Sequence, residues 1–287
     1  MPSDPPHLDP ATRLGPVHLT VSDLDRSLPF YEGVIGLQTR ARDGHAAALG
    51  AGGEDVVVLH ENPDARPAGR HAGLYHYALL FPTRAELARA AVRVATTRTA
   101  IQGASDHLTH EAIYLPDPDG IGIELAADRP RERWPDLSAV YRGGPQPLDV
   151  ADLLSVVHGE PPVAQAEAGV RVGHVHLHVS DLEPATRFYR DGLGFDVMAD
   201  LGSAVFVAAG GYHHHVAYNV WRGRGVPPAP ADGVAGLDHW TLVVPGETQV
   251  AEVADRLERL DGDATRDDGG VVAADPSGIR VRVQPAA

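Results

Sequence analysis

Three side chains with the chemistry of an active site follow one another near the middle of the chain: His107, Tyr114 and Glu124. The Asp-Pro-Asp-Gly segment at residues 117–120 separates the tyrosine from the glutamate and is typical of a tight turn. Strands are predicted on either side of this turn, which would place an imidazole, a phenol and a carboxylate on neighbouring strands. Such a cluster suits a divalent transition metal with an acid/base group beside it.

The composition excludes several classes of site and partner. The 287 residues include no cysteine, so disulfides, zinc–thiolate sites, iron–sulfur clusters and thiol nucleophiles are excluded, and any metal must be bound by His, Asp, Glu or water. The net charge of −15, with no cluster of basic residues, argues against a nucleic-acid partner. Because no segment resembles a signal peptide or a membrane span of roughly 20 apolar residues, we expect a cytoplasmic protein without membrane contact.

The sequence predicts a tandem duplication. Val-His-Leu at residues 17–19 recurs at residues 175–177, and Phe-Tyr at residues 30–31 recurs at residues 188–189. The Asp-Pro-Asp-Gly turn is matched by Asp-Pro-Ser-Gly at residues 275–278. These pairs share one offset of 158 residues, and a shared offset at several separate matches is the signature of a repeat.

Each half divides again into two units with the order strand, helix and three strands. The predicted fold class is therefore α+β, with four βαβββ modules in two tandem domains at residues 12–128 and 169–285, joined by a connector at residues 129–168. Thr83 is the expected N-cap of a helix over residues 84–96, and Gly36 is expected to end the first helix, which runs through Tyr31. The other expected helices are residues 183–192 and 247–260, and the main expected strands are residues 14–21, 46–49, 56–60, 74–81, 172–179, 204–208, 214–220, 237–244, 271–273 and 279–283.

Histidines recur at the strand positions of these units. A single histidine in a strand is more often structural than a metal ligand, but the joint occurrence at repeat-related positions favours a metal site. Glu124 lies in an apolar strand, where a buried carboxylate is costly unless a cation or hydrogen bonds compensate it. The candidate residues are His18 in the first unit, His76, His107, Tyr114 and Glu124 in the second, His174 and His214 in the third, and His239 in the fourth.

The repeated units resemble the vicinal oxygen chelate superfamily, which includes glyoxalases, bleomycin-resistance proteins and extradiol ring-cleaving dioxygenases. The run from His107 through Tyr114 and the turn to Glu124 is similar to the extradiol dioxygenase signature, with a small departure at Ser105. The likeness extends to two-domain catechol 2,3-dioxygenases. It implies curved mixed sheets and a non-haem Fe(II), or Mn(II), bound by two His and one Glu, with a catechol and O₂ as substrates.

The resemblance also implies roles for particular residues. His76 and Glu124 match two metal ligands, and His107 and Tyr114 match catalytic helpers. His174 matches the third ligand and His214 the remaining catalytic residue, but only if the second unit faces the third. We favour this cross-paired site because it fills every position.

A simpler arrangement remains open, in which the first and second units pair and His18 is the third ligand. A site between the first and fourth units would contain His239 but would have Arg282 in place of the carboxylate. A guanidinium cannot bind a metal, so that site is expected to be degenerate.

Two other functions remain as alternatives. The first is another metal-dependent enzyme of the superfamily, such as a glyoxalase-like isomerase or a thiol transferase. The second is a metal-free small-molecule binding or resistance protein. Exposed sheet edges in such domains also permit pairing into a homo-oligomer. Trp221, Trp240, Tyr212 and Tyr77 are candidate pocket-lining aromatics.

Overall fold

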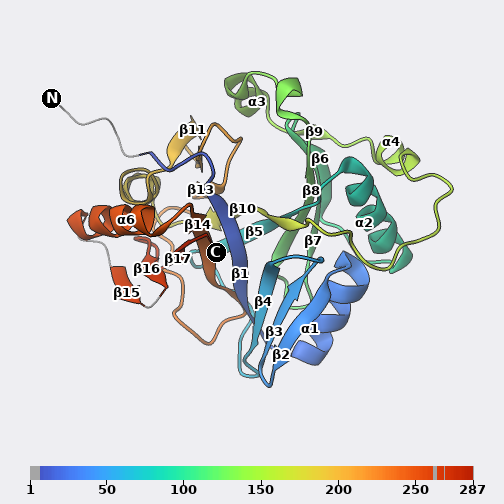
Figure 1. Cartoon of the computed structure of the whole chain (residues 1–287), viewed down its shortest axis with the longest axis horizontal. Helices are drawn as coiled ribbons and strands as arrows, with labels where there is room; N and C mark the ends of the chain where they lie inside the picture. Colours follow the sequence, from blue (N-terminus) through green and yellow to red (C-terminus); the bar gives the residue numbers. More distant parts are fainter. Residues whose placement is uncertain (1–6, 261–263, 268, 287) are drawn as a thin grey trace.

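The computed structural model describes residues 7–260, 264–267 and 269–286, and these fold into two mixed β-sheets with helices packed against them (Figure 1). Within the described residues, the first sheet has eight strands in the order β15 (Ala264–Asp267), β16 (Gly270–Ala274), β17 (Arg280–Pro285), β14 (Gly236–Val244), β1 (Arg13–Val21), β4 (Asp55–Glu61), β3 (Ala46–Gly50) and β2 (Gln38–Asp43). The second sheet has nine, in the order β11 (Asp196–Asp200), β12 (Ala204–Ala208), β13 (Val216–Asn219), β10 (Arg171–His178), β5 (Gly73–Leu80), β8 (Gly122–Asp128), β7 (His110–Pro116), β6 (Gly103–Asp106) and β9 (Gln146–Pro147).

The helical segments complete four βαβββ units, which confirms the predicted fold class. In the first and third units the α-helix continues directly into a π-helical turn, and the remaining helices belong to the second and fourth units and to the connector. In chain order these segments are α1 (Leu24–Phe30), η1 (Tyr31–Ile35), α2 (Arg84–Thr96), η2 (Arg131–Arg133), α3 (Leu137–Gly143), α4 (Val150–Ser155), α5 (Leu182–Thr186), η3 (Arg187–Leu193) and α6 (Glu247–Arg259).

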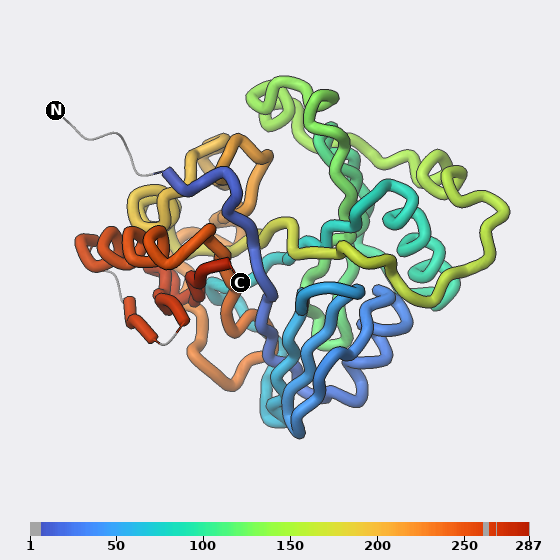
Figure 2. The backbone as a smooth tube through the Cα atoms, in the orientation of Figure 1, coloured from blue at the N-terminus to red at the C-terminus, as the bar shows by residue number. Residues whose placement is uncertain are grey.

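Each sheet is built from one unit of each repeat. In the first sheet, β1 of the first unit pairs antiparallel with β14 of the fourth, with Val17 opposite Trp240. In the second sheet, β10 of the third unit pairs antiparallel with β5 of the second, with Val175 opposite Tyr77. The chain therefore has the cross-paired arrangement. Figure 2 shows the connector, in yellow-green, running from α4 back across the molecule to β10. The sequence domains at residues 12–128 and 169–285 stay a prediction, because both sheets take strands from both.

The helix signals in the sequence correspond closely to the structure. Thr83 caps α2 by accepting a hydrogen bond from the backbone N–H of Glu86 at 3.1 Å. Asp23 caps α1 in the same way, and η1 ends at Gly36, whose φ of +90° lies in the left-handed region that favours glycine.

The strands that the sequence did not predict lie at the sheet edges or next to one. β2 is half-buried at its first two residues and exposed from the third on, and β15 has the short polar sequence Ala-Thr-Arg-Asp. Neither has the apolar alternation by which a half-buried strand is recognised, so these strands depend on pairing with a neighbour already in place. The short strand β6 comes directly after α2 in the chain, and β11 comes directly after η3. The two-residue strand β9 lies in the connector and pairs with β6.

The two Asp-Pro-x-Gly turns connect the sheets to each other. Asp117, in the turn between β7 and β8, accepts a hydrogen bond from the hydroxyl of Tyr31 at 3.1 Å. Asp275, at the related position between β16 and β17, accepts one from Tyr189 at 2.9 Å. Each bond joins a helix of one sheet's unit to a hairpin turn of the other sheet.

Among the described residues, no helix combines the length and apolarity that crossing a membrane requires.

Candidate metal centre

Three adjacent strands at the centre of the second sheet place His76, Glu124 and His174 on one face. His174 on β10 is opposite Ala78 on β5, and Ala78 is in turn opposite Glu124 on β8. Directly opposed residues in a sheet point to the same face, so the histidine and the glutamate lean toward each other over a small methyl group. His76 lies two residues before Ala78 and therefore shares this face.

The three side chains converge on a small buried space. Glu124 Oε2 lies 3.1 Å from Nε2 of His76 and 3.1 Å from Nε2 of His174, and the two Nε2 atoms are 3.4 Å apart. All three residues are buried, with Glu124 only 1% exposed. Of the groups of potential ligand atoms in the described residues, this one combines two imidazoles and a carboxylate with complete burial. The donor set therefore fits a divalent metal, and the chain has a buried His/Glu/His metal site.

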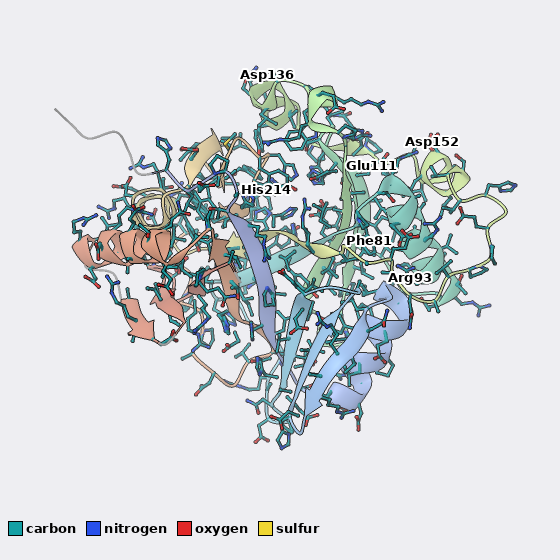
Figure 3. The ribbon with its side chains drawn as sticks, viewed as in Figure 1. Phe81, Arg93, Glu111, Asp136, Asp152 and His214 are labelled. Atoms are coloured by element: carbon teal, nitrogen blue, oxygen red, sulfur yellow. The ribbon has the colours of Figure 1, made fainter. Side chains whose placement is uncertain are left out.

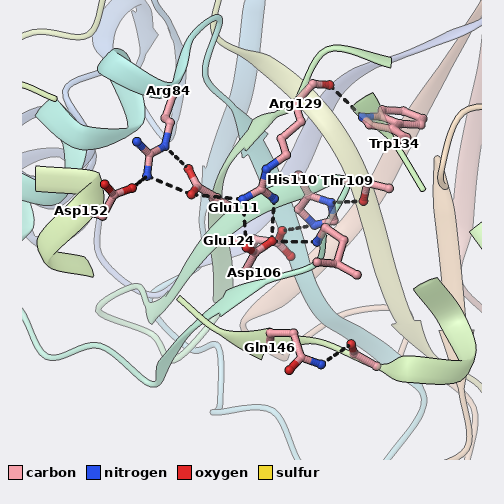
Figure 4. A network of polar contacts seen from close by, with 12 residues as sticks. Arg84, Asp106, Thr109, His110, Glu111, Glu124, Arg129, Trp134, Gln146 and Asp152 are labelled. Atoms are coloured by element: carbon pink, nitrogen blue, oxygen red, sulfur yellow. Dashed lines mark hydrogen bonds and ion pairs between the residues drawn. The ribbon is translucent and has the colours of Figure 1, made fainter. Parts of the chain in front are cut away.

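The second carboxylate oxygen of Glu124 also indicates a metal site. Oε1 is buried and has no aligned hydrogen-bond partner, although Nε2 of His110 lies 3.2 Å away. Figure 4 shows His110 between this oxygen and Thr109, whose hydroxyl lies 2.9 Å from Nδ1 of the ring. A buried carboxylate oxygen without a partner is costly, and a bound cation would remove that cost.

The electrostatics of the site favour the protonation states that bind a metal. Burial alone would raise the pKa of Glu124, but His174, His110 and His76 surround it and lower that pKa well below its usual value. Burial lowers the pKa of His174, and the nearby glutamate opposes this only in part. Near neutral pH the site therefore offers an anionic carboxylate and a neutral imidazole, which are the forms that act as ligands.

His107 and Tyr114 form a hydrogen-bonded pair beside the metal site. Nε2 of His107 lies 2.7 Å from the hydroxyl of Tyr114, which is opposite Glu124 across β7 and β8. Burial, with His110 nearby, lowers the pKa of His107 to about 4, and burial raises the pKa of Tyr114. At neutral pH the phenol is thus protonated and the imidazole is neutral. Such a pair can hold and move one proton next to a bound substrate.

His214, labelled in Figure 3, belongs to the loop between β12 and β13 and lies beside His174. Its ring centroid is 4.2 Å from that of His174, and burial lowers its pKa well below the usual value. Its Nδ1 lies 2.9 Å from Nδ1 of His213, whose Nε2 lies 3.2 Å from Asp128 Oδ1. The structure therefore brings together all six residues expected of the cross-paired site.

The sequence did not indicate the polar network around these six residues. His110, Asp128 and His213 form a second group of potential ligand atoms, in which the rings of His110 and His213 stack at 4.5 Å. The other oxygen of Asp128 accepts a hydrogen bond from Tyr212 at 2.9 Å. Through His213 this group contacts His214, and through His110 it contacts Glu124, so it helps to fix the positions of both side chains. Alternation from Glu124 along β8 was the signal that could have placed Asp128 on the same face.

The residues of the simpler arrangement lie elsewhere. His18 is on β1 in the first sheet, where its ring stacks against those of His60 and His239. Arg282 occupies the place of the carboxylate in that sheet and forms an ion pair with Asp267 at 2.7 Å. Within the described residues, no group of potential metal ligands forms around His18.

A cavity of about 470 Å³ opens over the metal site. The six site residues line one side of it, and Tyr75, Phe206 and Trp221 line another part. Of the four aromatic candidates, only Trp221 is among the lining residues. Trp240 and Tyr77 are core residues, 1% and 0% exposed, and Tyr212 bonds to Asp128 instead.

Comparison with known proteins agrees with this geometry. Both repeats match the family model described as Glyoxalase/Bleomycin resistance protein/Dioxygenase superfamily, over residues 13–125 and 171–283. The chain belongs to this superfamily. The resemblance seen in the sequence is thereby confirmed.

One member of the superfamily is similar to this chain along most of its length. It is a protein of Bacillus subtilis (strain 168) described as catechol-2,3-dioxygenase, 43% identical over 253 residues, with 86% of this chain and 88% of that protein covered.

Solved structures share the fold at lower identity. A putative dioxygenase from Bacillus subtilis has a TM-score of 0.66 at 14% identity, covering 96% of this chain and 86% of that one. Glyoxalase I from Zea mays has a TM-score of 0.59 at 18% identity, covering 96% and 92%.

Proposed function

We propose that the protein is an extradiol dioxygenase that opens the ring of a catechol-type substrate with O₂, at a non-haem Fe(II) bound by His76, Glu124 and His174. The observation that carries this proposal is the convergence of these three ligands on one buried point at the floor of a cavity. The 43% identical relative described as catechol-2,3-dioxygenase supports it.

Two imidazoles and one carboxylate would leave part of the metal's coordination sphere open to the cavity, which is typical of non-haem Fe(II) oxygenases. When bound, the ion supplies positions for the substrate oxygens and O₂ and exchanges electrons with them. The same ligands accept Mn(II), which is therefore the alternative metal.

His107 and Tyr114 are proposed to receive and orient the catechol. The imidazole of His107 is neutral at neutral pH, because burial keeps its pKa at about 4, and its Nε2 lies 2.7 Å from the phenol oxygen. It can therefore accept a proton from a substrate hydroxyl through Tyr114. Tyr114 lies opposite Glu124 in the sheet, so its hydroxyl is next to the metal ligands.

His214 is proposed to act on the side of the metal site that lies away from His107 and Tyr114, where O₂ would bind. Its Nδ1 is directed at His213, so Nε2 is the atom left to face the cavity that both histidines line. Hydrogen bonding through His213 to Asp128 fixes the ring's orientation. A neutral imidazole held in this way presents Nε2 to the cavity in a fixed orientation, ready to hydrogen-bond a bound oxygen species.

The alternatives make different demands on the same residues. A glyoxalase-like isomerase or a thiol transferase does not require the His107–Tyr114 pair. A metal-free binding protein has no use for a buried carboxylate between two histidines, which is costly without a cation. A cytoplasmic location, homo-oligomer formation and the absence of nucleic-acid or membrane partners stay predictions.

The experiment that tests the proposal is anaerobic reconstitution with Fe(II), Mn(II) or no metal, followed by catechol and then O₂. We expect one metal per chain, consumption of O₂ and a yellow semialdehyde product with Fe(II) or Mn(II), and none of these without metal. If the protein binds neither metal, the enzyme proposal is wrong. If it binds metal but leaves catechol intact while acting on a thiol-adduct substrate, the isomerase or transferase alternative holds.

A further inference from the structure

The cavity over the metal site has more room than one ring with two hydroxyls requires. Its volume is about 470 Å³, within the range of roughly 300–1,000 Å³ that holds drug-sized ligands. The metal ligands and the His107–Tyr114 pair occupy one side. Apolar side chains from three other segments line much of the rest: Val140 and Tyr141 of α3, Leu201 and Phe206 around β12, and Trp221 after β13. The uncharged polar side chains of Gln102, Ser105 and Thr109 line the part nearest β6 and β7.

The cavity wall offers no cation to a charged substituent. Among the described lining residues, Glu124 is the one carboxylate, and no arginine is present although the chain carries 24 basic residues. Arg222 follows Trp221 directly, but its Nη1 bonds to the carbonyl oxygen of His71 at 2.9 Å and it lines a separate hollow. A carboxylate on the ring would therefore lose its hydration without gaining a cationic partner from the cavity wall.

The rim of the cavity is also apolar. Tyr75, Leu201 and Trp221 are 44%, 47% and 53% exposed, which places them among the most exposed large hydrophobic side chains of the described residues. The rings of Tyr75 and Trp221 meet edge to face, with centroids 5.6 Å apart. Exposed apolar surface gathered at the mouth of a cavity typically marks where a ligand binds.

The connector supplies part of this wall. The ring of Tyr141 packs against Phe206 at 4.7 Å, and its hydroxyl donates a hydrogen bond to the backbone carbonyl of His213. The apolar wall is thus tied directly to the histidine loop of the site. Since α3 lies outside both repeats, this wall is an addition to the repeated fold.

From these observations we propose that the preferred substrates are catechols with an uncharged, apolar substituent, such as an alkyl chain, and that carboxylated catechols are disfavoured. This inference rests on the proposed function and names the substrate class of the same site. The substituent lies against Phe206 and Leu201 and reaches the rim at Trp221, while the diol faces the metal ligands.

The test compares catechol, 3- and 4-propylcatechol, and 3,4-dihydroxyphenylacetate, which carries a carboxylate. Dissociation constants are measured anaerobically by calorimetry with the Fe(II)-loaded protein, and kcat/KM is measured with O₂. Each buried methylene should tighten binding about four-fold, so we expect at least one propyl isomer to bind more than ten-fold more tightly than catechol. The carboxylated compound should bind more weakly than catechol.

Leu201→Ala and Leu260→Ala form a matched pair of variants, because both leucines are similarly exposed, at 47% and 42%, but only Leu201 lines the cavity. We expect Leu201→Ala to reduce the ratio of propylcatechol to catechol affinity several-fold and Leu260→Ala to preserve it. Equal effects of both variants, or tighter binding of the carboxylated compound, would overturn the inference. Failure of catechol itself to bind and react would instead overturn the proposed function, and this inference with it.

Discussion

Glu124 is buried among three histidines, and one of its two carboxylate oxygens lacks an aligned hydrogen-bond partner. Nε2 of His76 and of His174 both lie 3.1 Å from the other oxygen. The surrounding histidines stabilise the anion, but only a cation would use all the lone pairs that converge here. At the scale of residues, the site is therefore organised for a metal rather than for a salt bridge.

His174→Ala is expected to abolish stoichiometric metal binding, because it removes one of the three ligands. The loss should exceed the 10- to 100-fold reduction in affinity that is typical when only an outer-shell partner is removed. Metal content after dialysis against Fe(II) or Zn(II) measures the effect. His18→Ala is the matched control, since His18 lies in the other sheet, and should retain one metal per chain. The reverse result would favour the arrangement in which the first and second units share the site.

Tyr114→Phe removes the hydroxyl that bonds to His107 but leaves the ring in place. We expect unchanged metal content and a kcat for catechol cleavage lowered by about 10²-fold, at the lower end of what a positioned acid/base group contributes. Single-turnover absorbance of the Fe(II)-loaded protein measures the rate. A variant that cleaves catechol at the wild-type rate would show that the phenol moves no proton in the reaction.

At the scale of elements, the two Asp-Pro-x-Gly turns bind the sheets together. Asp117 and Asp275 are 5% and 4% exposed, and each accepts a tyrosine hydroxyl and two backbone N–H groups. Burial raises the pKa of each carboxyl to about 6 in the folded chain, despite these hydrogen bonds. The turns are therefore more stable with the carboxyls protonated than with them charged.

The double variant Asp117→Asn, Asp275→Asn should change how stability depends on pH. A carboxyl whose pKa is raised on folding binds more protons in the folded state, so its contribution is present below pH 4 and is lost as the pH rises through 6. The loss is up to about 3 kcal/mol for each carboxyl. The variant should therefore gain free energy of unfolding relative to wild type as the pH rises from 4 to 6, as measured by urea denaturation.

Asp43→Asn is the control for this pair, because Asp43 is an exposed carboxylate at the end of β2. It should keep the wild-type dependence of stability on pH. If the double variant and wild type differ by the same free energy at every pH from 4 to 6, folding does not raise the pKa of the buried carboxyls.

At the scale of the whole molecule, neither repeat can form the metal site alone. His76 and Glu124 come from the first repeat and His174 from the second, and antiparallel pairing of β5 with β10 brings them together. Pairing of β1 with β14 joins the repeats a second time. Two interfaces of sheet hydrogen bonds therefore hold the halves together independently of the connector.

A protease site inserted into the exposed residues 161–165 of the connector tests this organisation. After cleavage we expect the halves to elute together on size exclusion and to retain one metal per chain pair. Either half produced separately should bind no metal stoichiometrically. Dissociation of the cleaved protein, or metal bound by the first half alone, would contradict a site shared between the repeats.

The strong local signals were predictable from the sequence, as particular elements show. The cap at Thr83, the end of the first helix at Gly36 and the turn at residues 117–120 depend on backbone chemistry within a few residues. The edge strands β2 and β15 were not predictable, because their polar residues become strands only through a neighbour. The network of His110, His213 and Asp128 was missed for a related reason, since its members meet only across strands.

By itself, the sequence determined the four units, the repeat and the identity of the six candidate residues, because repeated motifs and their spacing are local properties of the chain. It left open whether His174 or His18 completes the site. Only the tertiary structure decided this, by pairing β10 with β5 and β1 with β14. The choice depends on which sheet edges bury their apolar faces against each other, and that is a property of the folded chain as a whole.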